Sequence, residues 1–274
     1  MTIKFGLIGG GVMGEALLSR IITCGIYQPS QVIVSEPQAS RRSFLEQQYG
    51  VVTTTDNSAV FTQATDVIFL AIKPQVFSAI ALELVDAINI NFNNGTSPLV
   101  ISILAGVSLH RLEAAFAKLP VIRAMPNTPA TVGAGVTAIA AGVKADSSNL
   151  ETARKIFSVV GEVVEVPESL MDAVTGLSGS GPAYVAIMVE ALADGGVAAG
   201  LPRAIAQQLA LQTVLGTAKL LSETKLHPAE LKDRVTSPGG TTIAGVSELE
   251  KASFRSALIE AVKAATIRSQ ELGK

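Results

Sequence analysis

The glycine-rich start of the chain limits the possible folds more than any other part of it. An apolar run, Lys4–Gly9, leads into Gly9, Gly11 and Gly14, which have the spacing G-x-G-x-x-G, and an amphipathic helical pattern follows. In a strand–turn–helix unit, the first glycine permits the tight turn, the second lets a pyrophosphate approach the backbone, and the third lets helix and strand pack closely. The pattern therefore predicts a dinucleotide-binding βαβ unit.

Strand-like and helix-like patterns alternate through the first half of the chain. Such alternation is typical of a mostly parallel sheet that is covered by helices on both faces. We therefore expect an α/β, doubly wound domain of the Rossmann type over residues 1–166. The expected strands are Lys4–Gly9, Gln31–Ser35, Val51–Thr54, Val67–Ala71, Leu99–Ile103, Val121–Ala124, Val136–Ala141 and Glu162–Val166, and the expected helices are Val12–Thr23, Ser40–Gln48, Gln75–Ile88, Ser108–Lys118 and Ser147–Val159.

Only helical patterns continue after Pro167, which predicts an all-helical second domain over residues 167–274. This half is rich in Ala and Leu and is more apolar than about a hundred residues can hide from water. Exposed apolar surface of this kind usually marks a subunit interface, so we expect a homodimer formed through the C-terminal helices. These helices are Tyr184–Val197, Arg203–Glu223, Thr242–Lys251 and Ala257–Leu272.

The composition argues against several classes of protein. Charged residues make up 16% of the chain, aromatic residues 4%, and the net charge is −2, so the basic footprint and stacking rings of a nucleic-acid-binding protein are missing. No stretch is an unbroken apolar span of the roughly 20 residues that a membrane helix needs, and the N-terminus does not resemble a signal peptide. The lone Cys24 excludes an internal disulfide, is expected to pack at a helix end, and fits a reducing, cytoplasmic location.

The end of the second predicted strand bears on the choice of coenzyme. An acid at this point binds the ribose 2′-hydroxyl of NAD, whereas a nearby arginine accommodates the 2′-phosphate of NADP. If Ser35 is the terminal residue, Arg41 or Arg42 could meet the phosphate, although both could equally lie on a solvated helix face. If Glu36 points inward, its charge favours NADH. The sequence favours NADPH and leaves NADH possible.

A second glycine-rich loop, Val235–Thr242, precedes an apolar helical segment near the C-terminus. Its glycines let a ligand approach the backbone, and the amides that follow lie at a helix N-terminus, which favours a carboxylate or a phosphate. An ordinary turn with an N-cap would share these features. We take the loop as the candidate substrate site; its residues with a predicted role are Val235, Ser237, Gly239, Gly240, Thr241 and Thr242.

Few side chains are available as an acid–base catalyst. His110 and His227 are expected to be structural, the latter at a helix start before a proline, and there is no Ser/His/Asp set or metal-ligand cluster. Alcohol dehydrogenases usually need a His, Lys or Tyr to handle the alkoxide proton, whereas an imine needs mainly orientation and a hydride donor. The residues alone indicate NAD(P)H-dependent reduction of a small, carboxylate-bearing C=N or C=O compound.

Six segments, taken in order, resemble the pyrroline-5-carboxylate reductase family over essentially the whole chain. The last is close to the family's own motif, and the first is shared with many dehydrogenases. The resemblance implies a Rossmann domain and a helical dimerisation domain that interlocks two subunits. It also implies reduction of 1-pyrroline-5-carboxylate to proline with NADPH or NADH, the last step of proline biosynthesis. The segments are Phe5–Gly14, Ala71–Pro74, Arg123–Pro129, Gly176–Tyr184, Ala193–Gly196 and Leu231–Thr242.

The resemblance also implies roles for single residues. The loop of residues 239–241 would hold the substrate carboxylate, Thr242 would orient or protonate the ring nitrogen, and Ser178 would shape the nicotinamide side of a site formed between subunits. Lys73-Pro74 and Ala105 also close predicted strands at the carboxyl edge, where ligands of open α/β sheets collect. The implied coenzyme contacts are Ile8, Gly9, Gly10, Gly11, Val12, Met13, Asn57, Ala71, Ile72, Lys73, Pro74, Ile103, Leu104 and Ala105.

The coenzyme preference, the assembly size and two rival functions stay open. Glu36 stands where some family members have a small hydroxyl residue that contacts the 2′-phosphate, which bears on the choice of NADPH. A ring of dimers occurs in the family, so the assembly could be larger than a dimer. One rival is a β-hydroxyacid dehydrogenase, which would need a helical lysine and a Gly-Gly motif where this chain has Gly179-Ser-Gly181. The other is an NADPH-binding dimer without catalytic activity.

Overall fold

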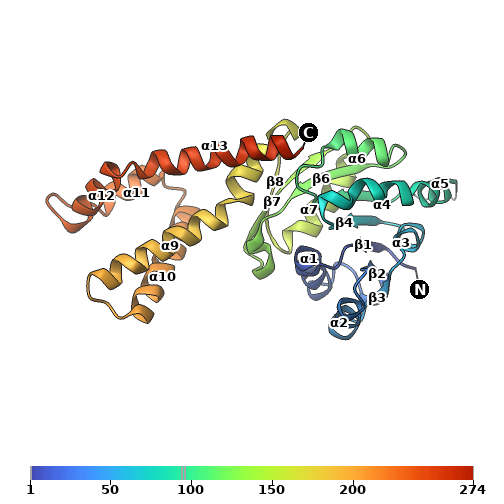
Figure 1. The fold of residues 1–274 in the computed structure, drawn as a ribbon, viewed down its shortest axis with the longest axis horizontal. Helices are drawn as coiled ribbons and strands as arrows, with labels where there is room; N and C mark the ends of the chain where they lie inside the picture. The colour runs from blue at the N-terminus through green and yellow to red at the C-terminus, as the bar shows by residue number, and fades with distance from the viewer. Residues whose placement is uncertain (1, 94, 96, 274) are drawn as a thin grey trace. The chain divides into compact units, whose positions relative to one another are not determined.

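The computed structural model describes residues 2–93, 95 and 97–273, and the chain divides into two compact units. The first contains the residues up to Gly179 together with the C-terminal residues from Ala265 onward, and the second runs from Ser180 to Ala264. The sheet belongs to the first unit and the second is helical (Figure 1). The predicted boundary at Pro167 stays a prediction.

One sheet organises the first unit, with the strand order β3-β2-β1-β4-β5-β6-β7-β8. The pairs from β3 to β6 are parallel, β7 runs antiparallel to β6, and β8 is parallel to β7. The chain order reverses beside β1, which is the switch point where open α/β sheets bind ligands. The strands are β1 (Phe5–Ile8), β2 (Val32–Ser35), β3 (Val52–Thr54), β4 (Val67–Leu70), β5 (Leu99–Ser102), β6 (Val121–Met125), β7 (Gly135–Ala141) and β8 (Gly161–Glu165).

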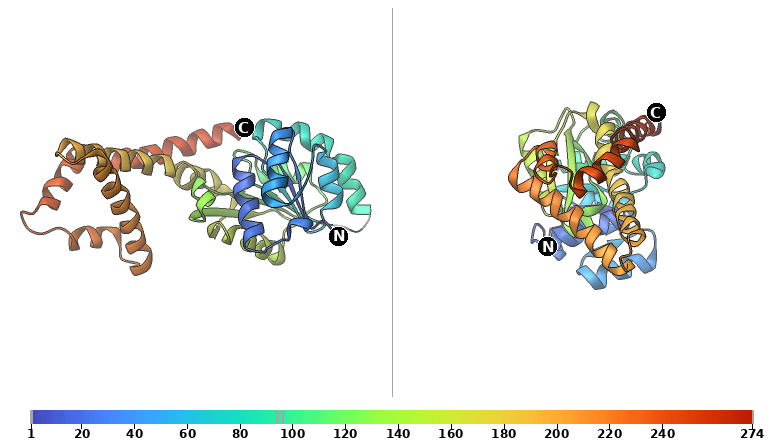
Figure 2. Two further views of the ribbon diagram at one scale, coloured as in Figure 1. Left: turned by 90° about the horizontal axis from the view of Figure 1, so that it is seen from below. Right: turned by 90° about the vertical axis from the view of Figure 1, so that its left-hand side faces the viewer.

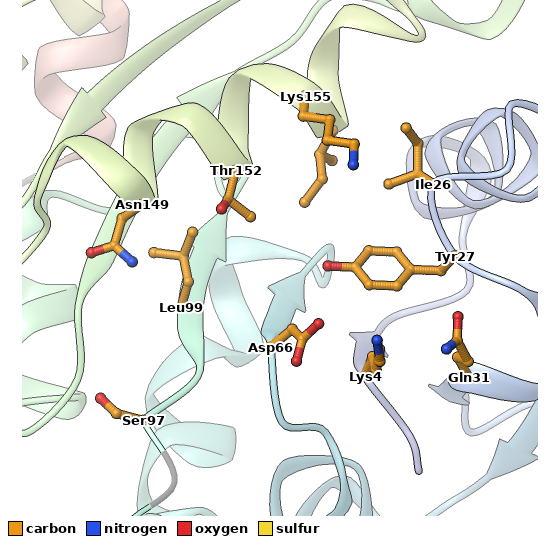
Figure 3. Close-up of a pocket in the computed structure, with 11 residues that line it drawn as sticks. Lys4, Ile26, Tyr27, Gln31, Asp66, Ser97, Leu99, Asn149, Thr152 and Lys155 are labelled. Carbon is orange, nitrogen blue, oxygen red and sulfur yellow. The ribbon is translucent and has the colours of Figure 1, made fainter. Parts of the chain in front are cut away.

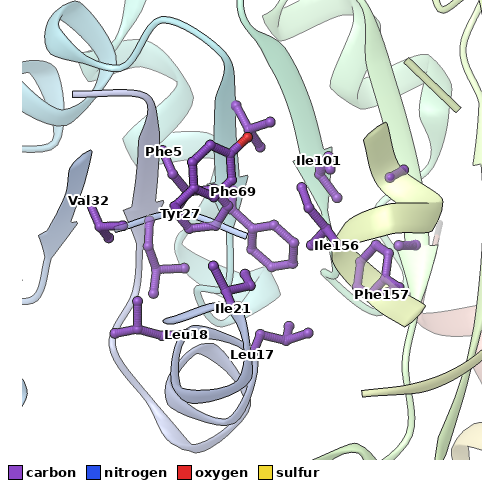
Figure 4. Close-up of a cluster of buried hydrophobic side chains, with 14 of the residues drawn as sticks. Phe5, Leu17, Leu18, Ile21, Tyr27, Val32, Phe69, Ile101, Ile156 and Phe157 are labelled. Atoms are coloured by element: carbon purple, nitrogen blue, oxygen red, sulfur yellow. The ribbon is translucent and has the colours of Figure 1, made fainter. Parts of the chain in front are cut away.

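Helices cover both faces of this sheet because side chains alternate between the faces along each strand. In β1, Phe5 and Leu7 belong to one buried cluster and Ile8 to the other. The first cluster adds Phe157 and side chains from α1 (Figure 4), and the second adds Phe61. The helices of this unit are α1 (Val12–Thr23), α2 (Ala39–Tyr49), α3 (Asn57–Gln63), α4 (Phe77–Glu83), α5 (Val85–Asn93), α6 (Leu109–Ala115), α7 (Ser147–Ser158) and α8 (Met171–Val174). The predicted doubly wound sheet is confirmed.

Two local predictions need correction, and one further helix is added. The helix predicted over Gln75–Ile88 is instead a short 3-10 turn followed by α4 and α5, because Leu84 ends α4 with its amide near the carbonyls of Ile80 and Leu82. The helix α3 was not predicted, although Asp56 caps it by accepting from the amides two and three residues on. Cys24 is exposed at the end of α1 and does not pack into the core.

The second unit consists of helices joined by turns and loops. Helices α9 (Gly181–Ala198) and α10 (Arg203–Thr224) pack together near the turn that joins them (Figure 2), and Gly196 lets them approach, since a β-carbon there would lie 3.1 Å from that of Ala206. The chain continues through α11 (Pro228–Arg234), α12 (Thr241–Lys251) and the start of α13 (Phe254–Leu272). His227 caps α11 through Nδ1, as expected of a helix start.

Large apolar side chains remain exposed on the second unit. On α10, Leu209, Leu211 and Leu215 are each more than half exposed in the single chain. The buried cluster of this unit is small and consists of Ala193, Ala206 and Ala210. In the described part of the chain, no helix is long and apolar enough to cross a membrane.

Candidate coenzyme and substrate sites

The glycines after β1 have the geometry that the motif requires. Gly9 has a φ of +104°, and a β-carbon there would lie 2.6 Å from the carbonyl oxygen of Ala71. A β-carbon on Gly14 would overlap the carbonyl oxygen of Gly9, which lets the first turn of α1 sit against the loop. Both positions therefore exclude any larger residue, as a tight dinucleotide-binding turn demands.

Gly11, by contrast, borders open space. A β-carbon on Gly11 would have nothing within 4 Å. Gly11 is the N-cap of α1, and no side chain caps this helix. The first amides of α1 thus have no partner within the helix, and the helix dipole favours an anion there. This uncapped helix start, with room above its backbone, fits a pyrophosphate.

The other predicted coenzyme residues lie along the same carboxyl edge of the sheet. Ala71 and the residues to Pro74 follow β4, and Ile103 to Ala105 follow β5. The Ser35 hydroxyl lies 2.7 Å from Asn57 Oδ1, which joins the end of β2 to the start of α3. Ile8 and Leu104 are buried in the core, so their side chains are not available to a ligand.

Glu36 points inward, toward the glycine loop. Its Oε2 accepts from the amide of Gly10 at 3.1 Å, its Oε1 accepts from the amide of Gln38 at 3.0 Å, and the residue is 7% exposed. A carboxylate is thus fixed beside the loop, at the strand end where acids select NAD. Sequence reasoning left this orientation open, because it depends on a contact between residues 26 positions apart.

Both arginines of this region are held by neighbouring groups rather than free in solvent. Arg41 donates to the carbonyl of Gly10 at 2.7 Å and pairs with Glu15, and its guanidinium lies 5.0 Å from the Phe44 ring centre. Arg42 donates to the carbonyls of Glu36 and Pro37 at 2.9 and 2.8 Å. Both side chains are partly exposed, so the choice between a solvated face and a phosphate contact stays open, and Arg42 lies beside the acid at the end of β2.

Glu15 sits between Arg41 and Tyr49 at the start of α1. Tyr49 donates to its Oε1 at 2.8 Å. Burial acts to raise the pKa of Glu15, but the hydrogen bonds from Arg41 and Tyr49 and the charge of Arg41 outweigh it, so the pKa is lowered. Burial and the bond to Glu15 raise the pKa of Tyr49. The group ties α1 to α2 next to the glycine loop.

The loop that sequence analysis assigned to the substrate lies in the second unit. Gly239 has a φ of +67°, and the amide of Gly240 donates to the carbonyl of Ser237 at 3.1 Å, which closes a tight turn. Gly240 is the N-cap of α12, again without a side-chain cap. Thr241 and Thr242 form the first turn of this helix, so their amides have no partner within it. The turn thus presents a second uncapped helix N-terminus, and Val235 and Ser237 are exposed beside it.

Ser178 lies in the first unit, apart in sequence from that loop. It belongs to a π-helical segment, Thr175–Gly179, and its hydroxyl donates to the carbonyl of Val174 at 3.0 Å. Sequence reasoning missed Asn127, whose Nδ2 donates to the carbonyl of Ser178 at 3.2 Å and whose Oδ1 accepts from the amide of Val136 at 2.9 Å. π-Helical turns often occur at functional sites, and Asn127 fastens this one to the sheet.

A Rossmann-type sheet with an uncapped glycine loop, joined to a helical unit, defines a dinucleotide-dependent oxidoreductase with a helical second domain. Two protein-family models match: pyrroline-5-carboxylate reductase dimerisation over residues 168–272, and NADP oxidoreductase, coenzyme F420-dependent, over residues 4–106. The chain is 61% identical to the pyrroline-5-carboxylate reductase of Synechocystis sp. over 100% of both chains. It belongs to the pyrroline-5-carboxylate reductase family and is an NAD(P)-dependent oxidoreductase.

Solved structures lead to the same family. A pyrroline-5-carboxylate reductase from Coxiella burnetii is 36% identical, with a TM-score of 0.91 over 100% of each chain. The pyrroline carboxylate reductase of Plasmodium falciparum, whose crystal structure has NADP bound, is 30% identical, with a TM-score of 0.87 over 99% of this chain and 98% of that one.

Proposed function

We propose that this chain reduces 1-pyrroline-5-carboxylate to L-proline by hydride transfer to the C=N bond. One observation carries the proposal: α12 begins after two glycines and has no side-chain cap. Such a helix start can bind a carboxylate with backbone amides alone. Membership of the family supports the same substrate.

In the proposed site, the amides that follow Gly239 and Gly240 hold the carboxylate and fix the orientation of the ring. Thr242 orients the ring nitrogen or passes a proton to it. An imine is basic enough to arrive protonated, so the site needs no ionisable acid. The bound coenzyme supplies the hydride. Holding both reactants in one orientation provides a large part of the rate acceleration.

The coenzyme of the proposed reaction is NADPH, with NADH as a possible second donor. The NADP-oxidoreductase match and the NADP-bound relative support NADPH, and Arg42 lies next to the strand end that would receive the 2′-phosphate. The inward carboxylate of Glu36 works against the phosphate, so we expect that NADH is also used.

We further propose a cytoplasmic homodimer, in which the C-terminal helices form the contact. The dimerisation model over residues 168–272 and the exposed leucines of α10 support the dimer. A ring of such dimers would need a second contact surface, repeated in every copy, that joins one dimer to the next. The lone cysteine supports the cytoplasmic location.

A direct assay tests the activity. Purified chain is mixed with 1-pyrroline-5-carboxylate and NADPH, or NADH in a parallel series, and the loss of reduced-nicotinamide absorbance is followed together with proline formation. Stoichiometric proline is expected with NADPH, and its absence with both coenzymes would refute the proposal.

The same preparation separates the rival functions. A 3-hydroxy acid with oxidised coenzyme serves as the second substrate, and coenzyme binding is measured by calorimetry. Oxidation of the hydroxy acid alone would point to a β-hydroxyacid dehydrogenase. Tight coenzyme binding without turnover of either substrate would point to a non-catalytic dimer.

A further inference from the structure

A polar cavity of about 370 Å³ lies at the edge of the sheet opposite the glycine loop. Lys4, Gln31 and Asp66, which help to line it, come immediately before β1, β2 and β4, so the cavity opens at the amino ends of these strands. The glycine loop follows the carboxyl end of β1. Because β1 has four residues and a strand rises about 3.3 Å per residue, the two edges are roughly 13 Å apart. The cavity is therefore separate from the coenzyme region.

Tyr27 supplies the main indication that a ligand belongs there. The residue is 8% exposed, and its ring packs on Phe5 with 5.2 Å between the ring centres. Its hydroxyl points toward the middle of the cavity (Figure 3) and has no hydrogen-bond partner among the described residues. No side-chain nitrogen or oxygen of the described residues is both fully buried and unpaired, so the Tyr27 hydroxyl is open to the cavity, where it can donate to an acceptor that enters.

The phenol is also kept in its donor form. Burial, together with the negative charge of Asp66, raises the pKa of Tyr27 to about 12. The hydroxyl therefore retains its proton throughout the physiological range. A carboxylate is the acceptor that a fixed O–H donor in such a position binds best.

Charged side chains of both signs surround the same cavity. Lys4 and Lys155 contribute ammonium groups and Asp66 a carboxylate, and none of the three makes an ion pair with another described residue. Asp66 accepts one hydrogen bond, at 2.9 Å, from the hydroxyl of Thr65. In Figure 3, the amine of Lys155 and the carboxylate of Asp66 lie on opposite sides of the Tyr27 hydroxyl.

We propose that this cavity binds a small α-amino acid as its zwitterion. The ligand carboxylate lies between Lys155 and Tyr27, and the ligand ammonium faces Asp66. A phosphate or other polyanion fits less well, because Asp66 would repel it. The volume is in the range of small-molecule sites, which begins at about 300 Å³. The inference does not rest on the proposed reductase activity.

Calorimetric titration of the full-length protein tests the proposal, with L-proline, L-glutamate and inorganic phosphate as separate probes. The variants are Tyr27→Phe, which removes only the hydroxyl and keeps the packing on Phe5, and Lys155→Ala. Lys144→Ala is the control, because Lys144 donates to the carbonyl of Ala117 outside the cavity. We expect at least one amino acid to bind about tenfold more weakly to each cavity variant than to the wild type or the control.

Proline is also the product of the proposed reaction, so its binding at the catalytic site must be distinguished. Proline bound at the catalytic site would have the same affinity in the wild type, the two cavity variants and the Lys144→Ala control. The kcat/KM for imine reduction would also be the same in these four proteins. If neither the wild type nor any variant reduces the imine, the proposed function is wrong. The titration can still be interpreted in that case. Three outcomes would overturn the amino-acid site. No amino acid binds, amino-acid affinity is the same in both cavity variants as in the wild type, or only phosphate binds more weakly when Tyr27 or Lys155 is replaced.

Discussion

The hydroxyl of Thr242 is the side-chain group on which the proposed chemistry depends most. Thr242 lies in the first turn of α12, next to the uncapped amides. Replacing it with valine keeps the shape and removes the hydroxyl. We expect Thr242→Val to lower kcat by about tenfold to a thousandfold, the range of a lost positioning or proton-transfer group. Steady-state kinetics checks this, and unchanged kcat and KM would remove Thr242 from the mechanism.

Glu36 is the residue expected to control the choice of coenzyme. Its carboxylate is fixed beside Gly10, where it would repel a 2′-phosphate. We expect Glu36→Ser to raise the ratio of kcat/KM for NADPH to that for NADH by about tenfold or more, since like charges in close contact are costly.

Glu36→Gln is the matched control for this experiment. Glutamine removes the charge but keeps one oxygen that can accept from the amide of Gly10. If charge is the cause, both variants shift the ratio in the same direction. An unchanged ratio in both would show that the carboxylate does not face the ribose.

The lowered pKa of Glu15 leads us to expect that the stability of the fold depends on pH. Because its pKa in the folded protein is lowered from the ordinary value of 4.5, the ionised carboxylate stabilises the fold above that pH, and this contribution is lost as the pH falls through the folded pKa. Glu15→Gln should therefore lower Tm at neutral pH, and the difference from wild type should shrink below pH 4.5. Thermal unfolding over this pH series is the measurement, and a difference that does not vary with pH would contradict the linkage.

Among the elements, the glycine loop offers a paired test of structure against binding. A methyl group on Gly14 would overlap the carbonyl of Gly9, whereas one on Gly11 would meet only open space. We expect Gly14→Ala to lower the free energy of unfolding by about 1–3 kcal/mol, as is typical for overpacking. Gly11→Ala should lower the free energy of unfolding by no more than about 1 kcal/mol, the cost of a poorer N-cap residue, and raise the Kd for the coenzyme, because its methyl group occupies the space proposed for the pyrophosphate.

Chemical denaturation and coenzyme titration distinguish these two effects. Equal stability of Gly14→Ala and wild type would show that the loop relaxes around the methyl group. Unchanged coenzyme affinity in Gly11→Ala would place the pyrophosphate away from α1.

Helices and strands could be predicted from the sequence where the local pattern of apolar and capping residues matches the packing in the fold. The strands of the sheet follow from apolar runs, and α6 begins after Ser108, as its cap predicts, with the Ser108 hydroxyl accepting from the amide of Arg111. The break between α4 and α5 was missed because apolar residues continue across Leu84, so the helical period shows no interruption. The π-helical turn at Thr175–Gly179 was missed because a long-range bond from Asn127 helps to hold it.

At the scale of the whole molecule, the exposed leucines of α10 lead to a prediction about assembly. A glutamate at the centre of a buried apolar interface would be left without water or a partner. We expect Leu211→Glu with Leu215→Glu to convert the dimer into a monomer at concentrations where wild type is dimeric. Light scattering coupled to size-exclusion chromatography measures the mass. Val143→Glu is the control, because Val143 is 92% exposed in the first unit, and a dimer that survives the double substitution would exclude this face of α10.

The sequence alone determined the class of sheet and predicted a coenzyme loop and a substrate loop, since each depends on local spacing: alternation of apolar residues, glycines at fixed intervals, and small residues before a helix. The tertiary structure decided the direction of the Glu36 carboxylate, the antiparallel pairing of β7 with β6, the anchoring of Ser178 by Asn127, and the placement of Tyr27 at the polar cavity. These features depend on which distant segments meet, and a side chain's direction is fixed only by the partners that folding brings to it.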